Sequence, residues 1–228
     1  MPMGPSSPAQ AIGTRGGSDV CYNAAMRTRL AAPAVLCGFV LLLTVACARG
    51  GDDPGTGASA WTAVDPTTAE GATAAALERA AEARAALFQR LSGRLTEVVS
   101  AEGPVAAIRV CRDEAPDLAR AVGADRDLRI GRTGVRLRNP DNSAPAWAAE
   151  AVSAQVAQRR AWQHEDGRIA ELSPILTAAQ CVACHGAPGA LAPGVADALA
   201  ELYPQDAATG FAEGELRGWF WVEVPAES

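Results

Sequence analysis

The 228-residue sequence contains no lysine, only three methionines and only two histidines. All three methionines, Met1, Met3 and Met26, lie near the start of the chain, so neither methionine nor lysine is available as a metal ligand in the rest of it. The sequence also has no internal repeat, P-loop, glycine-rich dinucleotide-binding pattern or serine-hydrolase motif. These absences argue against the nucleotide-binding and hydrolase classes, and we expect no catalytic residues and no enzymatic activity.

An apolar run of signal-peptide length follows Met26. Residues 26–46 combine two early arginines, the run LAAPAVLCGFVLLLTVA and small residues just before Cys47, which together predict an export signal. The letters LTVAC resemble a bacterial lipobox, so we expect cleavage before Cys47 and lipid attachment to its thiol. An ordinary signal peptide cut nearby, or a single anchor helix, is the alternative. Residues 1–25 are interpreted as an unstructured upstream extension.

The exported chain is expected to form one acidic domain at the periplasmic face of a membrane. Cleavage after residue 46 leaves 228 − 46 = 182 residues, with 17 arginines and 25 acidic residues, hence a formal charge of −8. Such a surface argues against nucleic-acid binding. Residues 47–67 are rich in glycine and predict a flexible tether. Residues 68–228 have the length of a single domain.

The pattern of the domain favours the α+β class. Helical spacing of apolar residues predicts a long amphipathic helix over 68–101, and Gly103-Pro104 ends it and begins a second helix over 104–123. That second helix is expected to turn Val105, Ile108 and Cys111 inward. Alternating residues then predict a strand from about residue 127, a hairpin centred on Asp166-Gly167 and a closing strand at GELRGWFWVEV, with a short helix between the first strand and the hairpin.

The segment QCVACHG carries the most specific signal in the chain. Its two cysteines, Cys181 and Cys184, are three residues apart and are followed at once by His185. On one helical turn both cysteine sulfurs can reach the same planar group, and the histidine imidazole projects beside them. The C-x-x-C-H spacing is that of c-type haem attachment, in which the thiols bind the vinyl groups and the histidine binds iron. We therefore predict one covalent haem c per chain.

Other uses of paired cysteines fit less well. A thioredoxin-type redox motif normally lies in an intracellular protein, next to a βαβ unit. A structural zinc needs four ligands, and the second pair would have to come from Cys111 and His164, which stand alone at unrelated spacings. A disulfide or a chance match is the plainest alternative. A colourless binding module stapled by zinc or a disulfide therefore remains the least favoured function.

Elimination narrows the set of residues that could be the second axial ligand of the iron. Without methionine or lysine, the candidates are Cys111, His164, Tyr203 or water. His164 lies two residues before the Asp166-Gly167 turn, where we expect it near solvent. Cys111 lies on the apolar face of its helix, and a free thiol is unusual in an exported chain. Cys111 is therefore favoured, with His164 as the main rival.

Four ordered segments resemble a known family. AIRVC, GRTGVRLRNPDNSAP, CVACHG and YPQDAATGFAEGELRGWFWVEV, within residues 70–225, are similar to the single-haem c-type family with a PAS-like fold, the cyanobacterial Tll-type haem domain. That family occurs in bacterial sensors and stand-alone exported proteins. The resemblance implies an antiparallel sheet flanked by helices, with haem held against the sheet.

The resemblance also implies roles for single residues. His185 and Cys111 would be the axial pair, and Arg132, Arg136 and Arg138 would lie near the haem propionates. Tyr203 is expected to pack beside the haem or to bond a propionate.

The function expected from these patterns is redox or small-ligand sensing by an exported, lipid-anchored haem protein with an unidentified redox or signalling partner. A single-haem electron-transfer cytochrome is the alternative.

Overall fold

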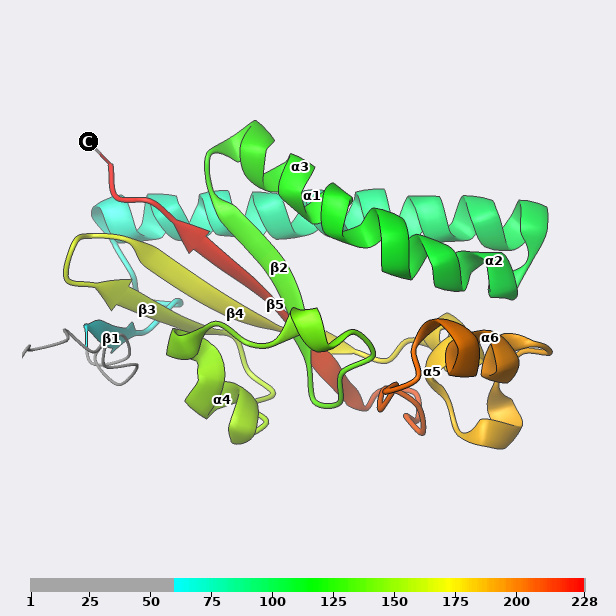
Figure 1. Cartoon of the computed structure of the whole chain (residues 1–228). Helices are drawn as coiled ribbons and strands as arrows, with labels where there is room; N and C mark the ends of the chain where they lie inside the picture. Colours follow the sequence, from blue (N-terminus) through cyan, green and yellow to red (C-terminus); the bar gives the residue numbers. More distant parts are fainter. Residues whose placement is uncertain (1–59, 228) are drawn as a thin grey trace, which may run out of the picture. The chain divides into compact units, whose positions relative to one another are not determined.

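The computed structural model describes residues 60–227, which form a five-stranded antiparallel sheet with helices on both faces (Figure 1). Across the sheet the strand order is β1-β3-β4-β5-β2, so the last strand lies between β4 and β2. The strands are β1 (Trp61–Val64), β2 (Arg129–Gly134), β3 (Arg160–His164), β4 (Ile169–Leu176) and β5 (Leu216–Val224). Residues 1–25, the signal segment 26–46, Cys47 and most of the tether lie outside the described residues.

The helices differ greatly in length. The longest, α1, is at the top of Figure 1 with α3 in front of it, whereas α4 lies below the sheet and α5 and α6 lie beyond its end. They are α1 (Gly71–Glu102), α2 (Pro104–Arg109), α3 (Ala115–Arg126), α4 (Ala149–Ser153), α5 (Val182–His185) and α6 (Val195–Leu202). A π-helical turn (Val110–Glu114) joins α2 to α3, and short 3-10 turns occupy Pro140–Asn142, Ala146–Ala148, Ala179–Cys181 and Pro188–Ala190.

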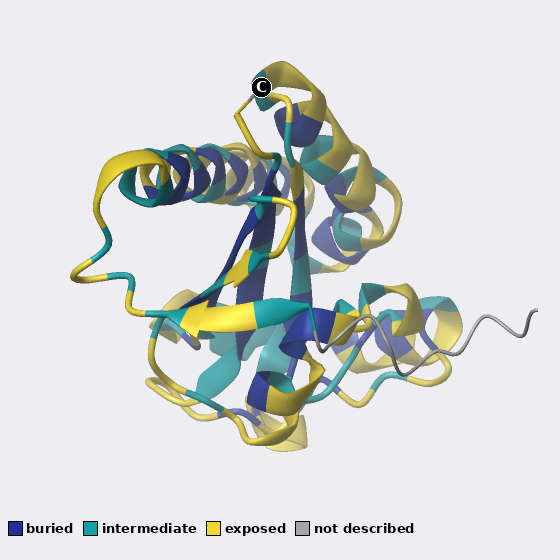
Figure 2. Cartoon of the chain, turned by 90° about the vertical axis from the view of Figure 1, so that its left-hand side faces the viewer, coloured by how far each residue is buried: buried dark blue, intermediate teal, exposed yellow. Residues whose placement is uncertain are grey.

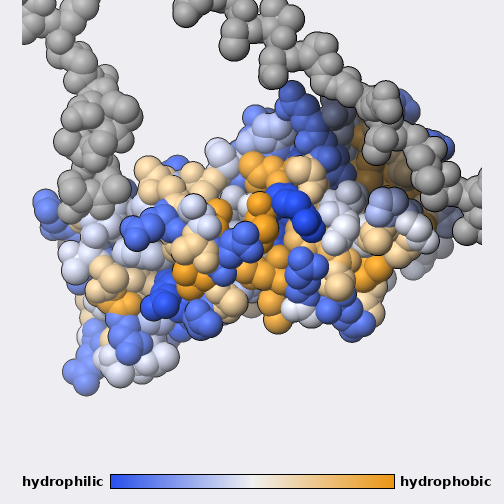
Figure 3. Space-filling model, turned by 90° about the horizontal axis from the view of Figure 1, so that it is seen from below, coloured by the Kyte–Doolittle hydropathy of each residue, from blue (hydrophilic) through white to orange (hydrophobic). Residues whose placement is uncertain are grey.

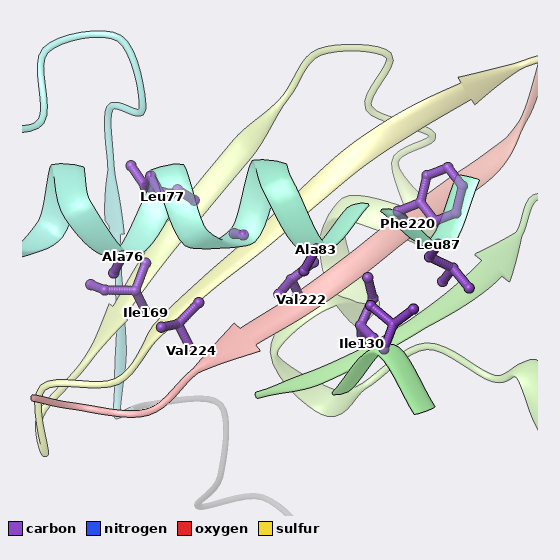
Figure 4. Close-up of a cluster of buried hydrophobic side chains, with 12 residues drawn as sticks. Ala76, Leu77, Ala83, Leu87, Ile130, Ile169, Phe220, Val222 and Val224 are labelled. Atoms are coloured by element: carbon purple, nitrogen blue, oxygen red, sulfur yellow. The ribbon is translucent and has the colours of Figure 1, made fainter. Parts of the chain in front are cut away.

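The main core lies between α1 and the sheet. Successive side chains of β5 point to opposite faces of the sheet, as in any strand. Phe220, Val222 and Val224 meet α1 on the face we call the α1 face, while Trp219 points to the face covered by α4. On α1, small residues such as Ala83 let the helix lie close to the strands (Figure 4). In Figure 2 buried residues accordingly colour parts of the long helix and much of the strands beside it.

The predicted α+β class is confirmed, with an antiparallel sheet flanked by helices and a long first helix. The predicted hairpin is also present between β3 and β4. There the Gly167 N–H donates to the His164 carbonyl at 2.9 Å, and Gly167 has a φ of +90°, a conformation that favours glycine.

The boundary of the predicted tether is wrong at its C-terminal end. Residues 61–64 form β1, which pairs with β3 along its whole length. The Trp61 ring lies with its centroid 5.9 Å from Trp147 and 4.7 Å from the His164 ring. Burial of this indole against the sheet edge, together with the ladder of backbone hydrogen bonds, accounts for the order of a segment that follows a glycine-rich stretch.

The predicted single helix over 104–123 is also corrected, because the π turn interrupts it. Pro116 has no backbone N–H to donate to the carbonyl four residues earlier, and the Ala115 N–H bonds the Val110 carbonyl, five residues back. The widened turn contains Cys111. Val105, expected to point inward, is 40% exposed.

The surface mixes polar and apolar residues, and hydrophobic residues lie among hydrophilic ones on the face in Figure 3. No helix within residues 60–227 is long and apolar enough to cross a membrane.

A buried carboxylate links α1 to the sheet and yields a first prediction. Glu171, only 1% exposed, accepts hydrogen bonds from Arg84 at 2.6 Å and from Arg159 Nε at 2.8 Å. Glu171→Ala leaves two partly buried guanidinium groups without a carboxylate, although Arg84 keeps its hydrogen bond to Ser173, so the free energy of unfolding should fall by about 3 kcal/mol in urea denaturation.

The exposed pair of Arg90 and Asp125, 2.8 Å apart, supplies the control. Asp125→Ala should cost less than about 1 kcal/mol. Equal losses for the two variants would show that the buried network does not connect α1 to the sheet as described.

Candidate functional site

A cavity of about 510 Å³ continues the α1 face beyond the end of the hydrophobic core. The second half of α1, α2, the π turn, β2, the ends of β4 and β5, and α5 enclose it. All eight residues predicted from the sequence to surround a cofactor line this one cavity: Cys111, Arg132, Arg136, Arg138, Cys181, Cys184, His185 and Tyr203. Segments more than 100 residues apart in the sequence thus meet at a single site.

The α1 side of the cavity is an apolar stripe. Phe88, Leu91, Leu95 and Val99 follow one another at helical spacing and all line the cavity. Phe88 is 56% exposed and Val99 is 44% exposed, and Leu176 on the sheet side is 55% exposed. This end of the long helix therefore offers apolar surface that no described residue covers.

Two paired glycines lie on the sheet side of the cavity. Gly134 of β2 and Gly218 of β5 are register partners, and both line the cavity. A Cβ on Gly134 would lie 2.8 Å from Nη1 of Arg217 and 2.9 Å from the Arg136 carbonyl, so a side chain there would collide with its neighbours. The two glycines therefore let Arg217 and the neighbouring backbone pack closely at this wall of the cavity.

The C-x-x-C-H segment forms the end wall. Cys181 ends a 3-10 turn and Cys184 lies in α5, so both thiols belong to one continuous helical turn. The Nδ1 of His185 lies 2.7 Å from the Ala208 carbonyl oxygen and 3.3 Å from the Nε of Arg217; because the carbonyl is the shorter contact and can only accept, we assign the proton to Nδ1. The lone pair is therefore on Nε2, and a hydrogen bond of this kind typically orients a metal-binding histidine.

Burial and nearby positive charges keep the imidazole of His185 neutral. Burial, followed by the charges of Arg217 and Arg138, lowers the pKa of His185 to about 3. The neutral ring is the form that binds metals.

Cys111 reaches the same cavity from the π turn. Burial raises the pKa of its thiol, and the nearby charges of Arg132, Arg138 and Arg217 oppose that rise. Cys111, Cys181 and Cys184 are all free thiols. Within residues 60–227 no group of three or more histidine, cysteine, aspartate or glutamate side chains is placed to hold a metal ion.

Arg138 is the most deeply engaged of the arginines. It is 7% exposed, and its Nη2 donates to the Cys184 carbonyl at 2.7 Å while its Nε faces Asp206 at 3.3 Å. Arg136 has no such partners: its guanidinium lies 3.9 Å from the Phe211 ring centroid, and its Nε and Nη2 are buried without a hydrogen bond. Nη1 of Arg138 is likewise unpaired.

Unpaired buried donors are costly, so these groups indicate an anionic ligand.

The sequence reasoning missed Arg217. This residue lines the cavity from β5, and its Nη1 donates to the Arg136 carbonyl at 3.3 Å. Burial, together with Arg138 and Arg132, lowers its pKa to about 10. The available signal was an arginine within the apolar closing strand, LRGWFWVEV.

Tyr203 and His164 have different positions. Tyr203, 7% exposed, lines the cavity and packs with Ile108 and Leu199, and burial raises its pKa to about 12. His164 does not line the cavity. It lies at the hairpin, where Nδ1 is 2.7 Å from Asp166 and the ring meets Trp61.

A family model, the Tll0287-like family, matches residues 67–225. The chain belongs to this family. No curated protein matches the sequence. Among solved structures, that of the cyanobacterial haem protein Tll0287 is 23% identical, with 67% of this chain and 96% of that chain covered and a TM-score of 0.49.

The arginines of this Tll0287-like chain yield the second prediction. In protein prepared without any cofactor, Arg138→Ala should lower the free energy of unfolding by roughly 3 kcal/mol, because Asp206 is left buried without its partner. Arg136→Ala removes donors that have no partner, and should cost no more than about 1 kcal/mol through its lost ring contact. Chemical denaturation of the two variants measures both values. A larger loss for Arg136→Ala than for Arg138→Ala would contradict the assigned contacts.

Proposed function

We propose that the cavity binds one haem per chain, attached through Cys181 and Cys184, and that the protein senses redox state or a small ligand. His185 would bind the iron through Nε2, and Cys111 would be the ligand on the other side. The observation that carries the proposal is the meeting of Cys111 with the C-x-x-C-H segment in one cavity, although 70 residues separate Cys111 from Cys181 in the sequence.

The chemistry of the cavity suits this cofactor. Its volume of about 510 Å³ lies within the roughly 300–1,000 Å³ usual for cofactor sites. The apolar stripe of α1 suits a flat macrocycle, while the unpaired donors of Arg136 and Arg138 suit its propionates.

Family membership adds support, because the protein for which the Tll0287-like family is named is described as a haem protein.

The ligand pair suits a sensor without catalysis. When bound, haem supplies a redox-active iron with two axial positions. A thiolate at Cys111 favours Fe(III) over Fe(II), so the potential should lie towards the low end of the roughly 0.8 V range that axial ligands span. Loss of that thiolate would free the π turn and change the contacts between α2, α3 and the cavity, giving a structural signal.

We also propose export and lipid attachment at Cys47, on the basis of the signal-like segment 26–46 and the LTVAC letters. The domain would then stand at the periplasmic face of a membrane and pass its signal to a partner protein there.

Covalent attachment gives the third prediction. Protein matured in a periplasm with haem-attachment machinery should keep peroxidase haem stain on a denaturing gel. Replacing both Cys181 and Cys184 with serine should abolish that stain, because no thioether bond can form. Cys111→Ala is the matched control and should keep the stain. A wild-type chain that stays colourless under these conditions would refute haem binding.

Lipid attachment gives the fourth prediction. The intact mass of protein purified from membranes should correspond to a chain that starts at Cys47 and carries a diacylglycerol-type addition. Cys47→Ser should lack the diacylglycerol-type addition, since no thiol remains at residue 47 to carry it. An unmodified N-terminus at residue 48 or beyond in wild-type protein would contradict lipidation.

A further inference from the structure

The imidazole of His185 lies against a segment without regular secondary structure. Residues 203–212 follow α6 and form neither helix nor strand. The Ala208 carbonyl oxygen of this segment lies 2.7 Å from Nδ1 of His185, and the Phe211 N–H donates to the His185 carbonyl at 2.9 Å. Such a segment can hold an imidazole in one orientation only if further contacts fix its own peptide groups.

Asp206 makes these contacts to Ala208. Its Oδ1 accepts a hydrogen bond from the Ala208 N–H, two residues further along the chain, at 2.8 Å, and it faces Nε of Arg138 at 3.3 Å. Nη2 of Arg138 in turn lies 3.4 Å from the Ala208 carbonyl oxygen. Ala208 is therefore held at its N–H by Asp206 and at its carbonyl by the arginine that pairs with Asp206.

Asp206 stands behind the cavity wall and not in it. Its side chain is 8% exposed, and neither Asp206 nor Ala208 lines the cavity, whereas His185 does. Any effect of this carboxylate on a group bound in the cavity must therefore pass through its neighbours. The shortest such route runs through Ala208 to the imidazole of His185.

We propose that Asp206 is a positioning residue for His185, because by holding Ala208 it keeps the carbonyl against Nδ1 and thereby directs Nε2 into the cavity. The inference deepens the proposed haem site and rests on it for its function, although the contacts belong to the chain itself. Aspartate suits this role because its short side chain closes a turn to the N–H two residues on, whereas glutamate is one methylene longer. Without this turn the Ala208 carbonyl is free to move and the imidazole is free to rotate.

The test measures solvent exchange of the His185 Nδ1 proton by NMR, in full-length protein prepared without cofactor and labelled with ¹⁵N-histidine. Asp206→Glu keeps the charge that faces Arg138 but does not fit the turn to Ala208. Exchange should therefore become at least about fivefold faster, the effect of losing one ordinary hydrogen bond. Asp206→Asn keeps an Oδ1 on an equally short side chain, so its exchange rate should stay close to that of the parent.

Asp65→Glu is the matched control, because Asp65 makes the same kind of contact, to the Thr67 N–H at 2.8 Å, and does not line the cavity. It should leave the His185 exchange rate unchanged. A merely structural role of Asp206 would speed the exchange of the β4 and β5 backbone amides by the same factor. Such an equal rise would overturn the inference, as would parent-like Nδ1 exchange in Asp206→Glu. If Asp206→Glu does not fold, Asp206→Ala takes its place with the same two outcomes.

Haem-loaded protein gives a second readout, at the iron. In ferrous protein with Cys111→Ala, the iron–histidine stretching band of the resonance Raman spectrum should move to lower frequency in Asp206→Glu and stay in place in Asp65→Glu. The reason is that a hydrogen bond at Nδ1 makes the imidazole a stronger ligand. An unshifted band in Asp206→Glu would overturn the positioning role. Colourless parent protein would refute the haem proposal alone, because the exchange measurement needs no haem.

Discussion

One buried guanidinium holds the functional segments of this protein together. Arg138 follows β2 by four residues, yet it donates to the Cys184 carbonyl at 2.7 Å and faces Asp206 at 3.3 Å. The Ala208 carbonyl, 3.4 Å from the same guanidinium, accepts the Nδ1 proton of His185. Arg138 thereby fixes the C-x-x-C-H turn against the sheet and orients the imidazole through a shared acceptor. The rest of the site depends on this contact, because α5 has only four residues of its own.

The α1 face of the sheet changes character along its length. From Val224 to Phe220 it carries the side chains that pack under α1 and form the main core. Arg132 lies opposite Phe220 on the neighbouring strand, and beyond this pair come Gly218 and Gly134, while α1 continues above them. The helix is longer than the core needs. The part of α1 that extends past the core, which includes the exposed Phe88 and Val99, forms one wall of the cavity. Stability and ligand binding thus use successive parts of the same two elements.

Much of the fold was predictable from local pattern. The helix over 71–102, the β3–β4 hairpin and the closing strand β5 follow from apolar periodicity and from the Asp166-Gly167 turn. Strand β1 was not, because four residues after a glycine-rich stretch carry little pattern, and Trp61 is ordered by contacts with Trp147 and His164 that are distant in sequence. The π turn was missed because helical spacing assumes regular bonding, although Pro116 marked the position.

The site was predictable to the extent that its residues have distinctive chemistry. Cys181, Cys184 and His185 are recognisable by spacing, and elimination favoured Cys111. What spacing could not show was which arginines have partners. Arg136 and Arg138 are two residues apart, yet one is unpaired and the other bonds two segments, a difference that only the three-dimensional contacts reveal. Arg217 was missed because its strand was assessed for fold alone.

We propose that Cys111 and His185 bind one iron from the two sides of the cavity. The most direct measurement is low-spin ferric EPR of the mature protein, compared between Cys111→Ala and His164→Ala, with CO binding to the ferrous form as a second readout. The account predicts that Cys111→Ala replaces the low-spin signal with one from a changed or open coordination position. It predicts that His164→Ala leaves the signal unchanged, because His164 lies at the hairpin outside the cavity. An unchanged spectrum in Cys111→Ala, together with conversion to high spin in His164→Ala, would contradict it.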